Sequence, residues 1–365
     1  MGHPFMLLFT ISVYFLYMGF IIWLLWGIRR AWRFHSTQAA GEALPFSIVI
    51  AAHNEEQVIG ETLQRLISQN YPDEKYEIVV VADRCSDRTA QIVEEYQAKV
   101  PGLQLISVLE VPPNMAPKKY ALQQGIARSQ HDHLILMDAD CLPGPGYLST
   151  FNKYFNGRAQ VVLNFPKVRV ENRILHRYLH LERLITWSIA AAGVGHRRPF
   201  LAFGGSWGYT REILEKAGGM ESVSHSLSGD DDLLIYRMGR LKPVMAVCFD
   251  PAGWVQTFLP PTFQHFLRQR RRHHSAGRHY ATGVKMGYAF FHLSHFLLWF
   301  LPVFFLPAII TLFGKFLLDG LTLHYAGKIF REKVQFKNGI LFEIGFLLHH
   351  LLIAPLGFIG KIRWK

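Results

Sequence analysis

The sequence predicts an α/β domain with a mostly parallel central sheet, set between apolar segments long enough to cross a membrane. Two observations support this prediction. Short apolar runs alternate with helical patterns through the middle of the chain. Long stretches with few or no charges lie towards both ends of the sequence. Strands that alternate with helices imply a parallel sheet with helices on both faces.

The first apolar segment predicts a membrane anchor. Residues 5–28 contain no charged residue, and Arg29, Arg30 and Arg33 follow them. A helix of this length spans the hydrocarbon core of a bilayer. A secretory signal would carry its basic residues before a shorter apolar core, so the segment is expected to be retained. The basic residues after it favour a cytoplasmic location for the domain that follows.

The soluble domain is expected over residues 45–278. The expected strands are residues 46–52, 76–83, 103–109 and 134–137, and the expected helices are residues 58–69, 89–99 and 118–129. Ligands bind at the carboxyl ends of the strands in such sheets. Three of these ends carry polar residues, namely Asn54 with Glu55, Asp83, and Asp138 with Asp140. We therefore expect these side chains to face one crevice.

The tripeptide Asp138-Ala139-Asp140 predicts a metal site, because it closes the apolar run 133–137. Two carboxylates one residue apart repel each other unless a cation lies between them. A hard divalent cation, bound through one or two carboxylates and the oxygens of a diphosphate, satisfies this arrangement. The alternative interpretation is a capped surface loop before Pro143.

The run Asp230-Asp231-Asp232 predicts the N-terminus of a helix. It lies between Ser228-Gly229 and the apolar residues 233–235, and acidic side chains are favoured at helix N-termini by the helix dipole. One acid of such a cluster can keep a raised pKa and act as a general base. We assign the base to Asp231, with Asp230 as the alternative, and an acidic surface cluster is the non-catalytic interpretation.

A second membrane region is expected over residues 288–360. The runs 288–313 and 340–360 are apolar, and the stretch between them is mixed. Pro302 and Pro307 can interrupt the first run, so two or three membrane helices are compatible with the pattern. The basic stretch 328–337 favours three, because it prefers the cytoplasmic side.

The net charge and the cysteine content limit the classes of binding partner and of metal or disulfide site that the sequence allows. Lysine and arginine number 39 against 27 acids, which gives a net charge of +12. Much of this excess flanks the apolar segments, so anionic lipid head groups and phosphorylated substrates explain it better than nucleic acid does. The spacing of Cys85, Cys141 and Cys248 fits neither a zinc site nor a disulfide framework, as expected for a reduced cytoplasmic domain.

Seven motifs resemble, in order, those of family 2 glycosyltransferases with a GT-A type nucleotide-sugar domain. The motifs are Ile50–Glu56, Val81–Asp87, Pro117–Leu122, Met137–Asp140, Phe203–Arg211, Ser228–Asp231 and Gln269–His273. They cover roughly residues 45–277. The resemblance implies a GT-A domain that binds a nucleotide-diphosphate sugar, most readily a UDP-sugar, and transfers the sugar with inversion.

The resemblance also implies roles for individual residues. Donor binding is implied for Ala52, Asn54, Glu55, Asp83, Lys118, Asp138, Gln269 and Arg272. Acceptor contacts are implied for Gly204, Gly205, Tyr209 and His273. Asp138 and Asp140 would hold Mg²⁺ or Mn²⁺, and Asp231 or Asp230 would be the base.

The sequence departs from the family pattern at two positions. His273 stands where membrane-bound members have Trp, which argues against a processive polysaccharide synthase. Pro117 replaces a Gly and stiffens the loop before Lys118 without removing the cation. Residues 174–194 show helical spacing of apolar residues. They are expected to form either an ordinary helix packed on the sheet or an interfacial helix that lines the route of a lipid acceptor.

These inferences together predict an integral membrane protein that glycosylates a hydroxyl group of a lipid. A glycolipid, a carotenoid or other terpenoid, and a polyprenyl-linked glycan are all compatible acceptors. The alternative enzyme is a processive polysaccharide synthase. A non-catalytic membrane scaffold is a third interpretation, which the presence of Lys118, Asp138, Asp140 and Asp231 disfavours.

Overall fold

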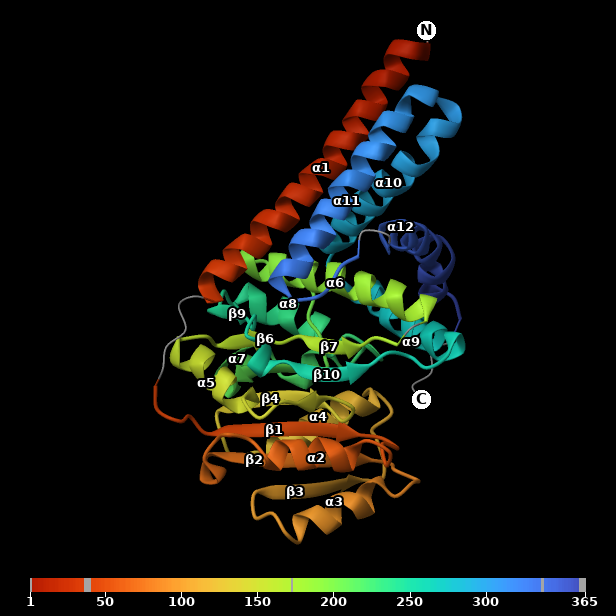
Figure 1. The fold of residues 1–365 in the computed structure, drawn as a ribbon. Coiled ribbons are helices and arrows are strands. Elements are labelled where there is room, and N and C mark those ends of the chain that lie inside the picture. Colours follow the sequence, from red (N-terminus) through yellow and green to blue (C-terminus); the bar gives the residue numbers. More distant parts are fainter. Residues whose placement is uncertain (1, 36–40, 172, 336–337, 361–365) are drawn as a thin grey trace. The chain divides into compact units, whose positions relative to one another are not determined.

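The computed structural model describes residues 2–35, 41–171, 173–335 and 338–360. The chain divides into two compact units (Figure 1). Of the described residues, unit 1 contains the chain up to Arg30, Val170–Gly195 and Pro260–Gly360. Unit 2 contains Ala31–Arg169 and His196–Leu259.

Unit 2 is built on a seven-stranded sheet with the order β3-β2-β1-β4-β8-β6-β9. Its strands are β1 (Phe46–Ala52), β2 (Tyr76–Asp83), β3 (Leu103–Val108), β4 (His133–Asp138), β6 (Val161–Leu163), β8 (Ser206–Thr210) and β9 (Met245–Val247). The neighbours β3, β2, β1 and β4 are parallel, whereas β8 runs antiparallel to both β4 and β6. The predicted α/β class with a mostly parallel central sheet is thus confirmed.

A smaller sheet has the order β5-β10-β7. Its strands are β5 (Leu142–Pro143), β10 (Val255–Phe258) and β7 (Pro166–Arg169). The helices of unit 2 are α2 (Ile59–Ile67), α3 (Thr89–Gln97), α4 (Pro117–Arg128), α5 (Tyr147–Asn156), α7 (Arg211–Lys216) and α8 (Asp232–Arg240), with short 3₁₀ turns η1 (Asp73–Lys75), η2 (Met220–Val223) and η3 (Pro251–Gly253).

Helix α4 lies very close to the sheet because of one glycine. A Cβ built on Gly125 would collide with Val49 of β1 and lie 3.1 Å from Val81 Cγ2 of β2. Both valines are wholly buried. Pro117 occupies the first turn of the helix, where its missing N–H costs nothing and its fixed φ suits the helix. These two residues fix both the start of α4 and its distance from the strands.

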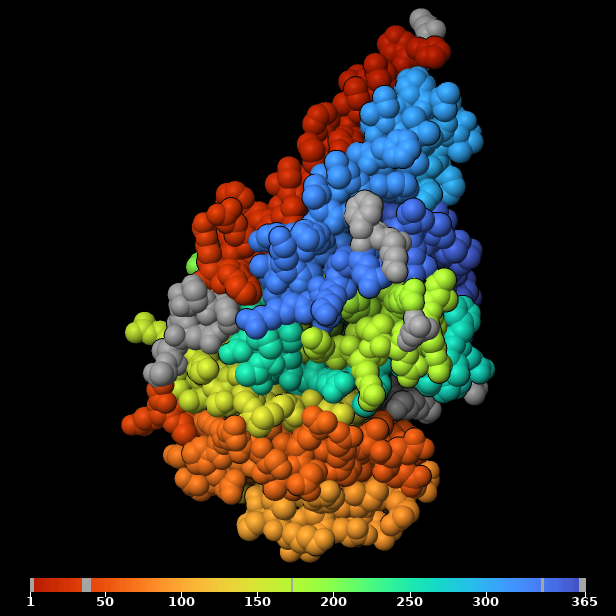
Figure 2. Space-filling view, viewed as in Figure 1, coloured from red at the N-terminus to blue at the C-terminus, as the bar shows by residue number. Residues whose placement is uncertain are grey.

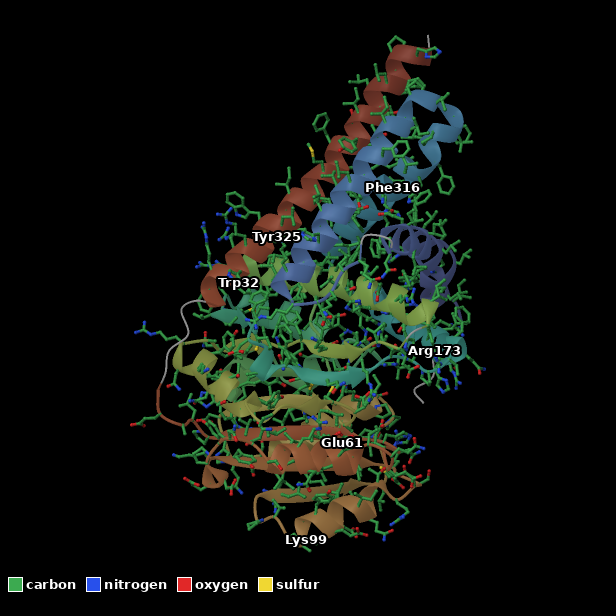
Figure 3. The ribbon with its side chains drawn as sticks, in the orientation of Figure 1. Trp32, Glu61, Lys99, Arg173, Phe316 and Tyr325 are labelled. Carbon is green, nitrogen blue, oxygen red and sulfur yellow. The ribbon has the colours of Figure 1, made fainter. Side chains whose placement is uncertain are left out.

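Charged side chains remain on the outer faces of the unit 2 helices. Figure 3 labels Glu61 on α2, whose carboxylate accepts a hydrogen bond from Arg65 Nη2 at 2.8 Å, and Lys99, which follows α3. Trp32, labelled in the same view, packs on Phe249 with ring centroids 5.1 Å apart. The apolar faces of these elements are therefore turned inward.

Unit 1 is helical. It contains the greater part of α1 (Gly2–His35), with α6 (Ile174–Gly195), α9 (Phe263–Ser275), α10 (Thr282–Phe304), α11 (Ile309–Ile329) and α12 (Asn338–Leu348). Shorter turns are η4 (Ala276–His279), η5 (Leu306–Ala308), the π-helical η6 (His349–Ile353) and η7 (Ala354–Phe358). Helices α6 and α9 group with the apolar helices in this unit.

Four helical segments of the described chain are long and apolar enough to cross a membrane. They are His3–Phe34, Thr282–Phe304, Leu306–Ile329 and Asn338–Phe358. One of them contains the predicted anchor 5–28, and three lie towards the C-terminal end, where the sequence was compatible with two or three. Apolar side chains such as Phe5, Trp26, Phe304 and Phe313 are exposed on them, as expected for helices that face lipid.

A buried ionic cluster joins three of these helices. Lys315 of α11 is wholly buried and forms ion pairs with Asp319 of α11, at 2.6 Å, and with Glu343 of α12. Tyr17 of α1 donates its hydroxyl to Asp319 Oδ1 at 2.6 Å. In the space-filling view, α1 and α11 lie against each other along this stretch (Figure 2). We call Tyr17, Lys315, Asp319 and Glu343 the bundle cluster.

Candidate active site

The register of the parallel strands brings the predicted site residues of β1, β2 and β4 to one edge. Ala52 of β1 pairs with Ala82 of β2, and Ala51 pairs with Asp138 of β4. The residues that follow these positions therefore leave the sheet side by side. This edge is the carboxyl end of the parallel strands, where open α/β sheets bind ligands.

The loops after β1 and β2 are hydrogen-bonded to each other. Asn54 adopts a positive φ of 56°, and its Oδ1 accepts a hydrogen bond from the backbone N–H of Ser86 at 2.8 Å. The backbone N–H of Glu55 donates to Thr89 Oγ1 at 2.8 Å. A side-chain amide tolerates this left-handed backbone better than most residues. The two loops therefore form one preformed wall.

Asp83 is buried and carries a partner that the sequence analysis did not foresee. Its carboxylate accepts hydrogen bonds from Arg84 Nε at 2.8 Å and from Arg84 Nη2 at 3.0 Å. The hydrogen bond to Asp83 raises the pKa of Arg84 above its ordinary value. A nucleoside at this wall would meet an Asp83–Arg84 pair. The sequence did contain a signal for this pair, because a positively charged residue directly follows the acid at the end of the strand.

Lys118 links two acids that lie 92 residues apart in the sequence. Its Nζ lies 2.8 Å from Asp138 Oδ1 and 2.8 Å from Asp230 Oδ2. Burial disfavours the charged ammonium, but these two carboxylates outweigh it and raise the pKa of Lys118 above its ordinary value. The predicted phosphate-binding lysine, metal motif and base motif are thus joined in one cluster.

Gly204 lies against this cluster, where a side chain would be crowded. A Cβ built there would lie 3.2 Å from Asp231 Oδ2 and 3.3 Å from Lys118 Nζ. The next residue, Gly205, accepts a hydrogen bond at its carbonyl from the backbone N–H of Asp138 at 3.1 Å. The glycine-rich segment therefore belongs to the same site as the acids, as the sequence predicted.

The three consecutive aspartates have three different partners. Asp230 pairs with Lys118, and Asp232 Oδ1 accepts a hydrogen bond from the backbone N–H of Ala202 at 2.9 Å. Asp231 is the N-cap residue of α8, and its Oδ1 accepts from the backbone N–H of Asp232 at 2.8 Å. Burial and the neighbouring Asp230 raise the pKa of Asp231 to about 6, against the opposing effect of Lys118.

Lys119 is a second buried lysine that the sequence analysis did not single out. Its Nζ donates to the carbonyls of Val223 at 2.6 Å, Ser226 at 2.7 Å and Ser228 at 3.0 Å. Burial lowers the pKa of Lys119 to about 8, although Asp230 and Asp231 act in the opposite direction. The sequence offered one signal for this burial, because Lys119 falls on the face of its helix that carries the apolar residues.

The donor set at the end of β4 suits a hard cation that a diphosphate also binds. Asp138 keeps about a third of its side chain exposed (35%), and Asp140 follows it in a turn closed by the Cys141 N–H and the Asp138 carbonyl at 3.1 Å. Within the described ranges, no group of three or more His, Cys, Asp or Glu side chains is placed to hold a metal ion. Two carboxylates that leave the remaining positions to phosphate oxygens and water match the usual Mg²⁺ arrangement.

Gln269, Arg272 and His273 belong to α9, which lies in unit 1, whereas the cluster around Lys118 lies in unit 2. Arg272 Nη2 lies 3.2 Å from His273 Nε2. The neighbouring arginines have structural partners within unit 1. Arg270 forms an ion pair with Glu182 of α6 at 2.6 Å, and Arg271 donates to the carbonyl of Ile359 at 3.1 Å.

Tyr209 does not fit the acceptor role inferred from the sequence. Its side chain is wholly buried in β8, in edge-to-face contact with Trp207 at a centroid distance of 4.7 Å. The flanking strands β4 and β6 pair with it at Leu134 and Val161. A residue in the middle of a seven-stranded sheet packs the core, so Gly204 and Gly205 are the acceptor-side candidates that remain near the cluster.

Comparisons with known proteins bear on the family of this chain. Residues 47–218 match the family model described as "Glycosyl transferase family 2". The probable glycosyltransferase YdaM of Bacillus subtilis is 30% identical over 231 residues, which make up 62% of this chain and 53% of that protein. The beta-monoglucosyldiacylglycerol synthase of Synechocystis is 26% identical over 200 residues, which make up 52% of this chain and 39% of that protein. The chain thus spans 53% or less of the length of these two relatives.

Among solved structures, the mannosyltransferase PcManGT from Pyrobaculum calidifontis, in complex with GDP-Man and Mn²⁺, has a TM-score of 0.49 at 15% identity. The comparison covers 95% of this chain and 96% of that one. The family match begins in β1 and ends after α7, so it includes the strand-end residues, Lys118, the Asp138–Asp140 motif and the glycine-rich segment. The match therefore identifies residues 47–218 as a glycosyl transferase family 2 domain.

Proposed function

We propose that the chain is a membrane-bound, inverting glycosyltransferase that moves a sugar from a nucleotide-diphosphate sugar to a hydroxyl group. The observation that carries this proposal is the cluster at the carboxyl edge of the sheet. Lys118 there lies 2.8 Å from both Asp138 and Asp230, and Asp231 and Gly204 adjoin it. A positioned cation can stabilise the charge that develops on a departing diphosphate, and a carboxylate beside it can accept the proton of the acceptor.

The reaction that fits this geometry has one proton transfer and one displacement. Asp231 accepts the proton of the acceptor hydroxyl, and the oxygen forms a bond to the anomeric carbon. The bond from that carbon to the diphosphate oxygen breaks on the opposite face, and the nucleoside diphosphate leaves with the electron pair. The ammonium of Lys118 is held next to Asp138. From there it stabilises the negative charge that grows on the leaving group.

Asp138 and Asp140 would hold the divalent cation, Mg²⁺ or Mn²⁺. When bound, such an ion neutralises charge on the diphosphate as it leaves. The walls formed by Asn54, Glu55 and the Asp83–Arg84 pair would hold the nucleoside, with Ala52 closing the end of β1. UDP-sugars are the donors that we would test first. Gln269 and Arg272 would act on the diphosphate and His273 on the acceptor.

A lipid acceptor is favoured by the four candidate membrane segments. One relative is a beta-monoglucosyldiacylglycerol synthase, whose name describes a glycolipid product. We propose that unit 2 lies in the cytoplasm, because Arg29, Arg30 and Arg33 follow the first apolar segment. A glycolipid, a terpenoid such as a carotenoid, or a polyprenyl-linked glycan would present its hydroxyl at the membrane surface.

Nucleotide release by the full chain in lipid nanodiscs tests this proposal. UDP- and GDP-sugars would be supplied with Mn²⁺ or Mg²⁺, with and without total lipid extract. We expect metal-dependent release from one donor that increases with lipid and that Asp140→Asn abolishes. The matched control is Glu61→Gln, an exposed acid on α2, which is expected to behave like the wild type. Absence of release from every donor would overturn the proposal.

The second candidate is a polysaccharide synthase. It is favoured by the match to the poly-beta-1,6-N-acetyl-D-glucosamine synthase of Staphylococcus epidermidis, 29% identical over 140 residues, which make up 37% of this chain and 32% of that protein. His273, in place of the expected Trp, is the feature against it. The products distinguish the two candidates: one sugar per acceptor supports the lipid transferase, and a polymer supports the synthase. A non-catalytic scaffold would release no nucleotide and form neither product.

A further inference from the structure

Lys119 is buried beside the site but its ammonium does not face the site's carboxylates as Lys118 does. Only 1% of the residue is exposed. An ammonium has three donors, and the three carbonyls of Val223, Ser226 and Ser228 accept hydrogen bonds from it. These bonds occupy all three donors. The ammonium of Lys119 therefore binds the backbone of the protein and has no donor left for a ligand.

The backbone that Lys119 holds leads directly to the base candidates. Ser228 is followed by Gly229, whose φ is +74°, and then by Asp230 and Asp231. Between η2 and α8 the chain has no regular structure. Its local backbone bonds are a weak one from Ser226 N to the Val223 carbonyl, at 3.4 Å, and one from Leu233 N to the Gly229 carbonyl, at 3.1 Å, where α8 begins. The residues between Val223 and Gly229 therefore depend on contacts from outside the segment, and they set where the chain enters the cap of α8 at Asp231.

Helix α4 is the rigid body that supplies those contacts. Lys118 and Lys119 lie in its first turn, and Gly125 holds the helix against Val49 and Val81 of the sheet. Lys118 binds the side chain of Asp230, while Lys119 binds the backbone just before it. The exposed Gln123 also bonds to Glu221 at 2.9 Å, but Glu221 lies in η2, before the carbonyls that Lys119 holds, so this bond is not part of the positioning contacts. One helix end thus fixes both the side chains and the backbone of the aspartate segment.

We propose that Lys119 is a positioning residue for sugar transfer, which sets the place of the Asp231 carboxylate by tying residues 223–228 to α4. This inference rests on the proposed function, in which Asp231 is the base. Charge alone does not fulfil this role, since a planar guanidinium has a different donor geometry from the ammonium. Lys119→Arg is therefore expected to be defective although it keeps the cation.

The test compares donor binding with transfer in full-length variants in nanodiscs. In Lys119→Ala, kcat for nucleotide release with lipid extract is expected to fall by about 10²-fold or more, within the range that a general base contributes. The KM for the donor is expected to stay within about threefold, because the residues that would bind the donor are untouched. Added methylammonium is expected to restore part of kcat in Lys119→Ala and none in Lys119→Arg.

The matched control is Gln123→Ala, which removes the exposed link from α4 to η2 and is expected to retain wild-type kcat. If the wild type releases nucleotide and Lys119→Ala keeps its kcat, the inference about Lys119 is wrong and the proposed function stands. A donor KM that worsens in step with kcat, without rescue by methylammonium, would show a structural role and also overturn the inference. Where Lys119→Ala does not fold, Lys119→Arg gives the same comparison of kcat with KM. A wild type that releases nothing overturns the proposed function itself.

Discussion

Asp230, Asp231 and Asp232 show how adjacent identical side chains acquire separate roles. The ion pair to Lys118 engages Asp230, and the hydrogen bond from Ala202 engages Asp232. Asp231, between them, caps α8 with one oxygen and has its other oxygen beside Gly204. Its pKa is raised to about 6 by burial and by Asp230. This is the condition that suits a general base near neutral pH.

The raised pKa of Asp231 predicts a pH profile. A base must be ionised to accept a proton, so transfer is expected to rise with pH through about 6 and to level off above it. Asp230→Asn removes the negative neighbour that raises this pKa. The acid limb of kcat is therefore expected to move to lower pH, and kcat against pH measures the shift.

Asp231→Asn is the companion variant and is expected to lose transfer at every pH. If Asp230→Asn loses transfer completely while Asp231→Asn retains it, the base is Asp230. An acid limb that does not move in Asp230→Asn would show that the rate follows a different group.

The sequence identified most of these residues but not their partners. Asp138 and Asp231 were found because each belongs to a group of carboxylates next to an apolar run, and Lys118 was found through the family resemblance. The bonds from Lys119 to Val223, Ser226 and Ser228 join positions more than 100 residues apart. Local patterns carry no information about such contacts. The burial of Tyr209 was missed for the same reason, because β8 is inserted between β4 and β6.

At the level of elements, the first half of unit 2 followed from sequence patterns. The strands β1 to β4 and helices α2 to α4 lie within two residues of their expected bounds, because apolar runs and turn residues delimit them clearly. The strands β6 and β9 have three residues each. A strand this short leaves too little alternation to identify it. The antiparallel insertion of β8 therefore emerged only from the structure.

The packing of α4 on the sheet predicts the effect of a single methyl group. Gly125→Ala improves helix propensity, but its Cβ would collide with Val49 and crowd Val81. Overpacking of this kind costs about 1–3 kcal/mol, so a net loss of stability is expected. Thermal unfolding of the full chain, followed by intrinsic fluorescence, measures it.

Gly60→Ala in α2 is the matched control for this prediction. The nearest atom to its Cβ would be Ile92 Cγ2 at 3.7 Å, an ordinary contact. Because nothing is crowded there, the higher helix propensity of alanine decides the outcome, and stability is expected to rise by about 1 kcal/mol or less. Equal effects of the two substitutions would contradict the close packing of α4.

For the whole molecule, the division into a helical unit and an α/β unit separates the candidate membrane helices from the Lys118 cluster. The bundle cluster lies in the first, and the Lys118 cluster lies in the second. Each has a lysine between two acids. In the bundle cluster Lys315 is wholly buried among Asp319, Glu343 and the ring of Tyr17. Ionisable residues in membrane-spanning helices are rare, and they commonly face the bundle interior and pair with one another.

The bundle cluster predicts strong coupling between its members. Lys315→Met leaves two buried acids without their cation, and breaking a buried ion pair in this way costs about 3–5 kcal/mol. The triple variant Lys315→Met/Asp319→Asn/Glu343→Gln removes all the charges together and is expected to recover most of the stability. Thermal unfolding in nanodiscs measures both variants. Losses that simply add would contradict the coupling.

The hydrogen bond from Tyr17 to Asp319 joins residues 302 positions apart. Ribosomal synthesis makes α1 first, and in the proposed membrane-bound form its backbone hydrogen bonds are satisfied within the helix as soon as it enters the bilayer. The Tyr17 hydroxyl, however, meets its acceptor only after α11 has been translated and inserted. In this form, the hydrogen bond between α1 and α11 therefore cannot form until the whole of unit 2 has been synthesised. Final assembly of the bundle then becomes a late event, which comes after the residues of the active site have already left the ribosome.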